Sequence, residues 1–133
     1  MRRKHASEPI VFISHQRIRP GKLDGYWENY QEVARYAEAN KPGTLAHLAY
    51  VSQDGTEARV VHIFPDANAM AAHMQGVGEI ARKAAEFMEI AGFEIYGDPG
   101  EAILIAMQKA GGGSIPMQVM PRQVGGYIRL KPG

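Results

Sequence analysis

The stretch TLAHLAYVSQDGTEARVVHIF, residues 44–64, decides the fold of this chain. Two runs rich in strand-forming side chains, Thr44–Ser52 and Glu57–Phe64, flank the four residues Gln53–Thr56. The Asp-Gly step within those four residues suits a tight turn, because aspartate and glycine tolerate the backbone conformations that hairpins need. The segment therefore predicts a β-hairpin.

The residues before the hairpin predict one strand and one long helix. Ile10–Ile18 has strand propensity, and Arg19–Lys22 contains the Pro-Gly pair of a turn. Along Lys22–Ala39, apolar side chains recur every three or four positions, which is typical of a helix packed against a core. These residues are Leu23, Tyr26, Trp27, Tyr30, Val33, Ala34 and Ala37. Gly25 has low helix propensity, so its presence indicates a tight packing contact at that point of the helix.

After the hairpin the sequence predicts two helices and a strand. Asp66 is a candidate N-cap for a short helix ending near Gln75, and a second helix is expected over Glu79–Ala91. Phe93–Tyr96 is then expected to be the fourth strand. The order strand, helix, strand, strand, helix, strand is typical of a ferredoxin-like fold.

The last part of the chain predicts a helix–strand extension. Asp98–Glu101 has the pattern of a helix start, and the helix is expected to run to Met107. Ile115–Met120 is expected to form a fifth strand, and residues 125–130 are a candidate for a short sixth.

The predicted organisation is one α+β domain with additions at both ends. Residues 1–9 form an N-terminal arm, 10–97 the ferredoxin-like domain, and 98–133 its C-terminal extension. Such an antiparallel sheet carries helices on one face, so its other face needs a cover. We expect a second copy of the chain to supply it, which predicts a homodimer.

The composition excludes several classes of protein. Fifteen Lys and Arg against fourteen Asp and Glu leave a net charge of +1 over 133 residues, which gives no case for nucleic-acid binding. The absence of cysteine excludes disulfides, thiolate catalysis and iron–sulfur clusters. The longest apolar runs are too short for a membrane span. We therefore expect a soluble, cytoplasmic protein without membrane or nucleic-acid partners.

Several segments, taken in order, resemble the antibiotic biosynthesis monooxygenase-like family. They are the turn Arg19–Lys22, the segment Lys41–Leu45, the turn Gln53–Gly55 and the run Phe64–His73, and the resemblance covers residues 10–97. It implies a dimeric α/β barrel with a ligand cavity between the helices and the sheet of each protomer. It also implies one of several activities, because members oxygenate quinol-type aromatics without metal or flavin, open the haem ring, or are not catalytic.

The haem-degrading activity fits this sequence poorly. Those members carry a tryptophan near the start of the second helical region and a histidine that binds iron further on. Here the only tryptophan, Trp27, lies in the first predicted helix, and no histidine follows Gly78 in the second helical region.

His73 is the candidate catalytic residue. It lies with Met70, Met74 and Val77 on one face of the predicted second helix, where a histidine is either a packed core residue or a cavity residue. The resemblance places it at the histidine that often follows the start of that helix. A neutral imidazole there could accept the proton of a phenol.

Five further residues are candidates for substrate binding. Trp27, Tyr30 and Tyr50 could donate hydrogen bonds to an aromatic ligand, although such residues are most often core. His47 and His62 lie within the predicted hairpin strands and face either the cavity or the dimer interface. We expect neither a metal nor another cofactor, because no His-x-His or His-x-x-x-His spacing occurs and the strand register is not readable from the sequence.

The sequence leaves two functions open. The first is a cofactor-independent monooxygenase acting on an electron-rich aromatic substrate, such as a quinol or a polyketide-like compound. The second is a non-catalytic dimeric module that binds a small apolar molecule or a partner protein.

Overall fold

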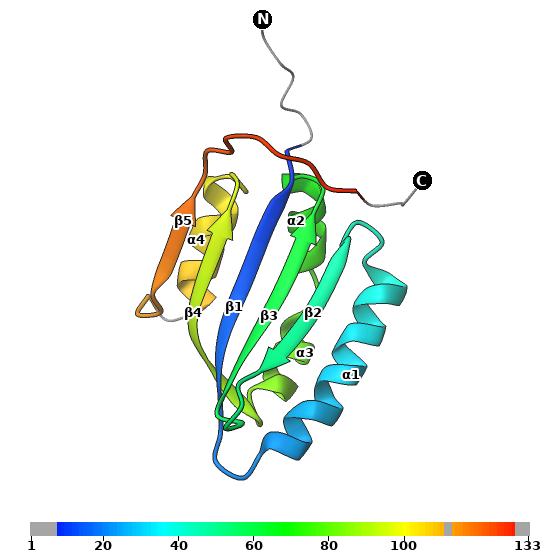
Figure 1. The fold of residues 1–133 in the computed structure, drawn as a ribbon, viewed down its shortest axis with the longest axis vertical. Coiled ribbons are helices and arrows are strands. Elements are labelled where there is room, and N and C mark those ends of the chain that lie inside the picture. The colour runs from blue at the N-terminus through cyan, green and yellow to red at the C-terminus, as the bar shows by residue number, and fades with distance from the viewer. Residues whose placement is uncertain (1–7, 111–112, 130–133) are drawn as a thin grey trace, which may run out of the picture.

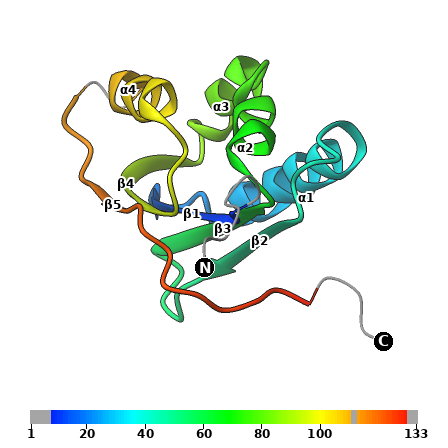
Figure 2. The ribbon, with the colours of Figure 1, turned by 90° about the horizontal axis from the view of Figure 1, so that it is seen from above.

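The computed structural model describes residues 8–110 and 113–129. Five strands form one sheet in the order β2-β3-β1-β4-β5, and the helices lie together on one of its faces (Figures 1 and 2). The strands are β1 (Ile10–Ile18), β2 (Ala46–Val51), β3 (Glu57–Phe64), β4 (Met88–Tyr96) and β5 (Met117–Met120). The helices are α1 (Leu23–Asn40), α2 (Ala67–Met74), α3 (Gly78–Ala84) and α4 (Glu101–Ala110).

The sheet has the predicted antiparallel centre with one parallel addition. Strands β1 to β4 pair antiparallel throughout, which confirms the ferredoxin-like α+β fold. The extension then adds β5, which pairs parallel to β4, so the whole sheet is mixed. A parallel neighbour requires a crossover connection, and α4 provides it. In the part of the chain that the structure describes, no helix is long and apolar enough to cross a membrane.

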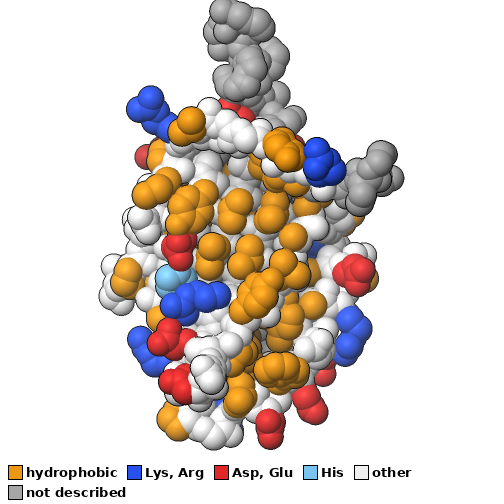
Figure 3. Space-filling model, in the orientation of Figure 1, with side chains coloured by type: hydrophobic (Ala, Val, Ile, Leu, Met, Phe, Trp, Pro, Cys, Tyr) orange, Lys and Arg blue, Asp and Glu red, His pale blue; other side chains and the backbone are white. Residues whose placement is uncertain are grey.

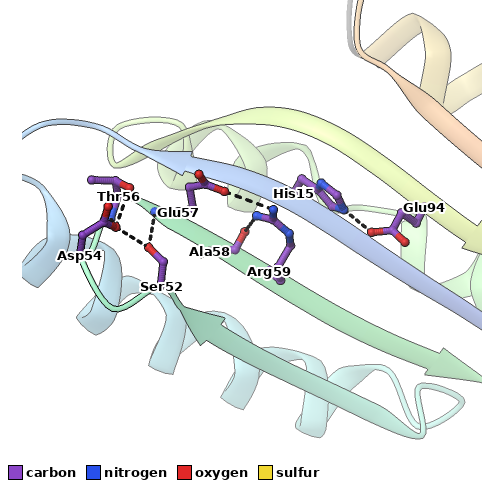
Figure 4. A network of polar contacts seen from close by, with 8 residues as sticks. All are labelled: His15, Ser52, Asp54, Thr56, Glu57, Ala58, Arg59 and Glu94. Carbon is purple, nitrogen blue, oxygen red and sulfur yellow. Dashed lines mark hydrogen bonds and ion pairs between the residues drawn. The ribbon is translucent and has the colours of Figure 1, made fainter.

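The central hairpin forms as its turn residues predict. The Asp54 carboxylate accepts hydrogen bonds from the Ser52 hydroxyl (2.8 Å) and from the Thr56 backbone N–H (3.1 Å) and hydroxyl (2.8 Å; Figure 4). These hydrogen bonds, chiefly those from Thr56 and Ser52, lower the pKa of the Asp54 carboxyl group. Gly55 has a φ of 76°, the left-handed conformation that favours glycine. The turn therefore fixes how β2 and β3 pair.

Alternation along the strands separates two faces of the sheet. One cluster of buried side chains lies under α2 and α4, and a second lies near the hairpin turn under α1 and α3. The first contains Ile10, Phe12, Phe64, Met70, Ile95 and Met107, and the second contains Ile18, Tyr26, Ala58 and Met88. The opposite face has no helix over it in either view (Figures 1 and 2).

The predicted helix over Glu79–Ala91 is wrong in its second half. Helix α3 ends at Ala84, and β4 begins at Met88, well before the predicted strand Phe93–Tyr96. Periodicity in this segment fits a helix, but Met88 pairs with Ile18 at the end of β1. Strand pairing with a central strand outweighs the local preference, because it satisfies backbone groups along a buried edge.

The C-terminal predictions are confirmed in part. Helix α4 forms, and the Asp98 carboxylate accepts a hydrogen bond from the Gly100 N–H (2.9 Å) in front of it. The fifth strand is shorter than predicted and begins at Met117. Residues 125–129 contain no strand, and Leu130 lies outside the described residues, as does most of the N-terminal arm.

The packing contact expected at Gly25 is present. A Cβ atom at this position would lie 2.5 Å from Cε1 and 2.7 Å from Cδ1 of Phe87, which is closer than two carbon atoms can approach. Helix α1 can therefore reach the segment after α3 only because residue 25 has no side chain.

Replacing Gly25 should thus reverse the usual effect of alanine in a helix. We expect Gly25→Ala to lower the free energy of unfolding by about 1–3 kcal/mol, because Phe87 has to move out of its place. Gly78→Ala is the control, since a Cβ there meets no atom nearer than 3.8 Å. Urea unfolding of both variants measures the difference, and a stabilised Gly25→Ala would contradict the packing argument.

Candidate active site

Three histidines from different elements converge on the helix-covered side of the sheet. His47 of β2 lies directly opposite His62 of β3, and His73 comes from the last turn of α2. The ring centroids of His47 and His62 are 4.5 Å apart, and that of His73 lies 5.7 Å and 5.3 Å from them. We call these three residues the histidine cluster.

Local structure fixes where each ring lies. Helix α2 begins at Asp66, whose carboxylate accepts a hydrogen bond from the Ala69 N–H (2.8 Å), as its predicted N-cap role requires. The helix therefore carries Met70 into the core and His73 one turn later over the hairpin. Phe12 of β1 stacks on His62 at a centroid distance of 4.6 Å.

Each ring uses its Nδ1 atom in a hydrogen bond to the protein. The Nδ1–H of His62 donates to the Phe12 carbonyl oxygen (3.1 Å). The Nδ1 atoms of His47 and His73 lie 2.7 Å from the hydroxyls of Tyr30 and Thr44 respectively. The sequence carries no signal for the Thr44 contact, because this contact joins a loop to a helix residue 29 positions further along the chain.

Burial keeps the cluster uncharged. Burial, together with the neighbouring imidazoles, lowers the pKa of His62 to about 3 and that of His47 to about 4. The pKa of His73 is also lowered, first by burial and then by the ammonium group of Lys41. All three rings are therefore neutral at pH 7, where an imidazole can accept a proton or bind a metal.

The cluster opens onto a cavity between the sheet and the helices. Its volume is about 270 Å³, and most of its lining is apolar. All four helices contribute to it, for example through Val33 of α1, Met74 of α2, Ile80 of α3 and Met107 of α4. A cavity of this kind suits a flat apolar ligand held by a few polar groups.

Polar side chains that the sequence did not single out lie along one wall of the cavity. The Tyr26 hydroxyl donates to the Gln16 side-chain oxygen (2.6 Å), and the Gln16 amide donates to Ser14 (3.3 Å). Asn29 of α1 is buried and lines the same cavity. Among the described residues no hydrogen-bond partner is found for its side-chain amide, which leaves that amide open to a ligand. The sequence did carry a signal for Asn29, because it is a polar residue on the apolar side of the predicted helix.

Two of the predicted binding residues lie outside this cavity. Trp27 is 56% exposed and borders a shallow groove beside Ala49 and Val51. It was expected on the buried side of its helix, but β2 is the edge strand, so no element covers this side of α1. Tyr50 is 60% exposed because its side chain points to the opposite face of the sheet. Tyr30, His47, His62 and His73 all line the cavity.

Comparison with known proteins gives structural matches alone. No protein-family model matches the sequence, and no curated protein matches it. The structure is similar to that of MupZ from Pseudomonas fluorescens, with a TM-score of 0.67 and 17% identity over 92% of this chain and 95% of that one. This coverage exceeds what residues 1–97 could supply, so the match extends into the C-terminal extension.

Two further matches cover a smaller share of this chain. SnoaB, a cofactor-independent oxygenase from Streptomyces nogalater, has a TM-score of 0.60 and 12% identity over 71% of this chain and 97% of its own. A Bacteroides thetaiotaomicron protein, provisionally assigned as an antibiotic biosynthesis monooxygenase, has a TM-score of 0.57 and 18% identity over 68% and 88%. The chain thus has the fold of antibiotic biosynthesis monooxygenase-like proteins, which confirms the resemblance at the level of structure.

The buried neutral histidines should make stability depend on pH. An unfolded histidine takes up a proton below pH 6.5, while folded His47 and His62 do so only near pH 4 and pH 3. The unfolded chain therefore binds more protons between these values, so the free energy of unfolding falls as the pH drops from 7 to 4. Each histidine contributes up to about 1.4 kcal/mol per pH unit in this window.

Urea unfolding in the presence of a chelator, at several pH values from 7 to 4.5, measures this loss. In His62→Asn one buried imidazole is gone, so we expect the loss to be smaller than in the unaltered chain. An equal loss in both proteins would show that His62 does not resist protonation in the folded state.

Proposed function

We propose that the protein is a cofactor-independent monooxygenase of an electron-rich aromatic substrate, such as a quinol or a polyketide-like phenol. The observation that carries this proposal is the apolar cavity with uncharged imidazoles at one end. The similarity of the fold to that of SnoaB is consistent with it.

In the proposed reaction, His73 takes the phenolic proton of the bound substrate. Burial and the Lys41 ammonium group lower its pKa, so the ring is unprotonated and able to accept a proton at pH 7. Its Nε2 atom accepts the proton, and the Nδ1–H of the resulting imidazolium donates to the Thr44 hydroxyl. The product of this step is an aromatic anion in a mostly apolar cavity, and its charge is delocalised onto ring carbon.

Oxygen then reacts with the anion. One electron passes to O₂, and the superoxide and the substrate radical combine to form a carbon–oxygen bond at a ring carbon that bears hydrogen. The peroxide takes a proton back from His73, and loss of water from the hydroperoxide leaves a carbonyl at that carbon. One O₂ is consumed and one water is formed, with the other oxygen atom retained in the product.

Asn29 and Tyr30 are suited to hold the substrate during these steps. The Asn29 amide can donate to the phenolate oxygen as its charge develops. Burial raises the pKa of Tyr30 to about 12, so its hydroxyl stays protonated and can act as a donor. Both groups lie on α1, across the cavity from the sheet.

The alternative is a module that binds an apolar molecule without changing it. The same cavity would serve this function, because an apolar lining requires no reaction. The two functions differ in what happens to the ligand in the presence of oxygen.

Oxygen uptake with a reduced naphthoquinol tests the proposal on chelator-treated protein. We expect saturable uptake, and we expect His73→Asn to lower kcat by about 10²–10⁴-fold, because asparagine keeps a side-chain contact to Thr44 but cannot accept the proton. His15→Ala is the control, since His15 pairs with Glu94 on the opposite face of the sheet (Figure 4).

Each result has a definite meaning. Full activity in His73→Asn would remove His73 from its role as the base. Uptake no faster than autoxidation of the quinol, together with binding of the unchanged compound, would favour the binding module.

We further propose that the protein is a homodimer formed through the uncovered face of the sheet. A broad patch of hydrophobic side chains covers that face (Figure 3). One row across it consists of Leu48, Val61 and Ile13, which are cross-strand partners. A second copy of the chain would bury this hydrophobic patch away from water, and such burial is the main stabilising effect in obligate dimers.

Sedimentation velocity measures the oligomeric state directly. We expect a species of about twice 14.6 kDa for the unaltered chain and a monomer for Leu48→Glu, because a buried carboxylate opposes association. Ile105→Glu on α4 is the matched control, since Ile105 is 45% exposed and Leu48 47%. A Leu48→Glu dimer as stable as the unaltered one would place the interface elsewhere.

A further inference from the structure

We propose that His47, His62 and His73 bind a divalent transition-metal ion of the zinc type. This goes beyond the proposed oxygenase, which needs one of these rings as a base and no metal. It also departs from the sequence-based expectation of no metal, which rested on the absence of a short histidine spacing. The cluster instead combines two paired strands and a helix, so that its members are 15 and 11 positions apart.

The hydrogen bonds of the three rings leave their Nε2 atoms available for a metal ion. Histidines that bind metals through Nε2 almost always use Nδ1–H in a hydrogen bond to the protein, which fixes the ring and its tautomer. A carbonyl oxygen can only accept, so His62 carries its proton on Nδ1 and a lone pair on Nε2. The Tyr30 and Thr44 hydroxyls can accept from Nδ1–H in the same way. All three rings can therefore present a lone pair at once.

The Nε2 atoms can also be reached from the cavity. No hydrogen bond to Nε2 of these rings is found among the described residues. In the same part of the chain, every side-chain nitrogen or oxygen atom that is itself shielded from water has a partner. The three Nε2 atoms therefore retain open surface, and all three residues line the cavity. An ion entering the cavity would meet them directly.

The distances between the ring nitrogens are close to those of a metal site. One nitrogen from each ring can be chosen so that all three lie within 4.8 Å of one another. Two imidazole nitrogens on a tetrahedral zinc ion lie about 3.3 Å apart, given Zn–N bonds of about 2.0–2.1 Å. Each distance between two ligand nitrogens therefore has to shorten by about 1.5 Å at most. We expect small side-chain rotations to achieve this, chiefly at His47, because it is the least buried of the three residues.

The charges around the cluster select the ion and its fourth ligand. Three neutral imidazoles suit zinc and its neighbours among the transition metals, whereas calcium and magnesium require oxygen ligands. No carboxylate is found among the described residues that line the cavity. The bound ion would thus keep its charge of +2 and favour an anionic oxygen in its open position, such as hydroxide or a phenolate.

Lys41 is the charged group that opposes binding. Its ammonium group lines the cavity and lowers the pKa of His73. It is held by the carbonyl oxygens of Ala72 (3.1 Å) and Gln75 (2.7 Å) at the end of α2, which bear partial negative charge. These contacts compensate part of its charge and keep it away from the ring nitrogens.

Co²⁺ titration of the full-length, chelator-treated chain tests the proposal without any substrate. We expect one Co²⁺ per chain with the visible absorption of a tetrahedral complex, and displacement by Zn²⁺. Replacing His47 or His62 with asparagine keeps a donor near the Nδ1 position but removes the ligand atom, so affinity should fall at least about 100-fold. Thermal melts of the metal-free variants verify that they fold. We expect His47→Asn to disturb folding less than His62→Asn, because His47 is less buried.

Two more variants separate this site from adventitious binding. Thr44→Val removes the hydrogen-bond partner of His73 and should weaken binding by about 10–100-fold without removing a ligand. His15→Ala should bind as tightly as the unaltered chain, because His15 lies on the other face of the sheet.

The outcomes are decisive. Loss of binding in the cluster variants with retention in His15→Ala supports the site. Absence of one-to-one binding, or unchanged affinity in His47→Asn and His62→Asn, overturns it. One lone pair cannot hold a metal and accept a proton at the same time, so oxygenation is measured on metal-free protein. Failure of either proposal therefore leaves the other intact.

Discussion

The antiparallel pairing of β2 with β3 places His47 opposite His62, and the rest of the candidate site depends on that register. Side chains alternate along a strand, so a shift of one residue would move His47 to the uncovered face. The turn at Asp54 and Gly55 prevents such a shift by fixing the length of the connection. Once the two rings share a face, α2 needs only to bring His73 above them.

Burial gives the cluster its chemical character. Three imidazoles within contact distance cannot all be charged, and the apolar cavity makes even one charge costly. The fold thus maintains a set of basic nitrogens without protons at neutral pH. The same condition serves proton abstraction and metal binding, which explains why one site supports two proposals.

The sequence predicted the fold well because its signals are local. The Asp-Gly turn, the stripe of α1 and the N-cap at Asp66 each act within a few residues. The part that failed, the segment after Ala84, depends on pairing with β1 about 70 positions earlier. No local pattern carries that information, since Met88 and Ile90 suit a helix as well as a strand.

The site was predictable only as a set of candidates. His47, His62 and His73 were each named, but their convergence required the register of the hairpin and the placement of α2. Trp27 lies outside the cavity because β2 is at the edge of the sheet, which periodicity along one helix does not reveal. Thr44 was missed because a single polar residue in a loop carries no pattern, whereas Asn29 was marked only by being polar on the apolar side of its helix.

The edge position of β2 also has a consequence for how the cavity is reached. A strand held by one neighbour opens locally more often than one held by two, because fewer hydrogen bonds break. His47 is thus attached to the least firmly held strand of the four-stranded core, while His62 lies on a strand flanked on both sides. Transient fraying of β2 would separate the His47 ring from the His62 ring. It would also provide a route by which small molecules move between the cavity and the solvent.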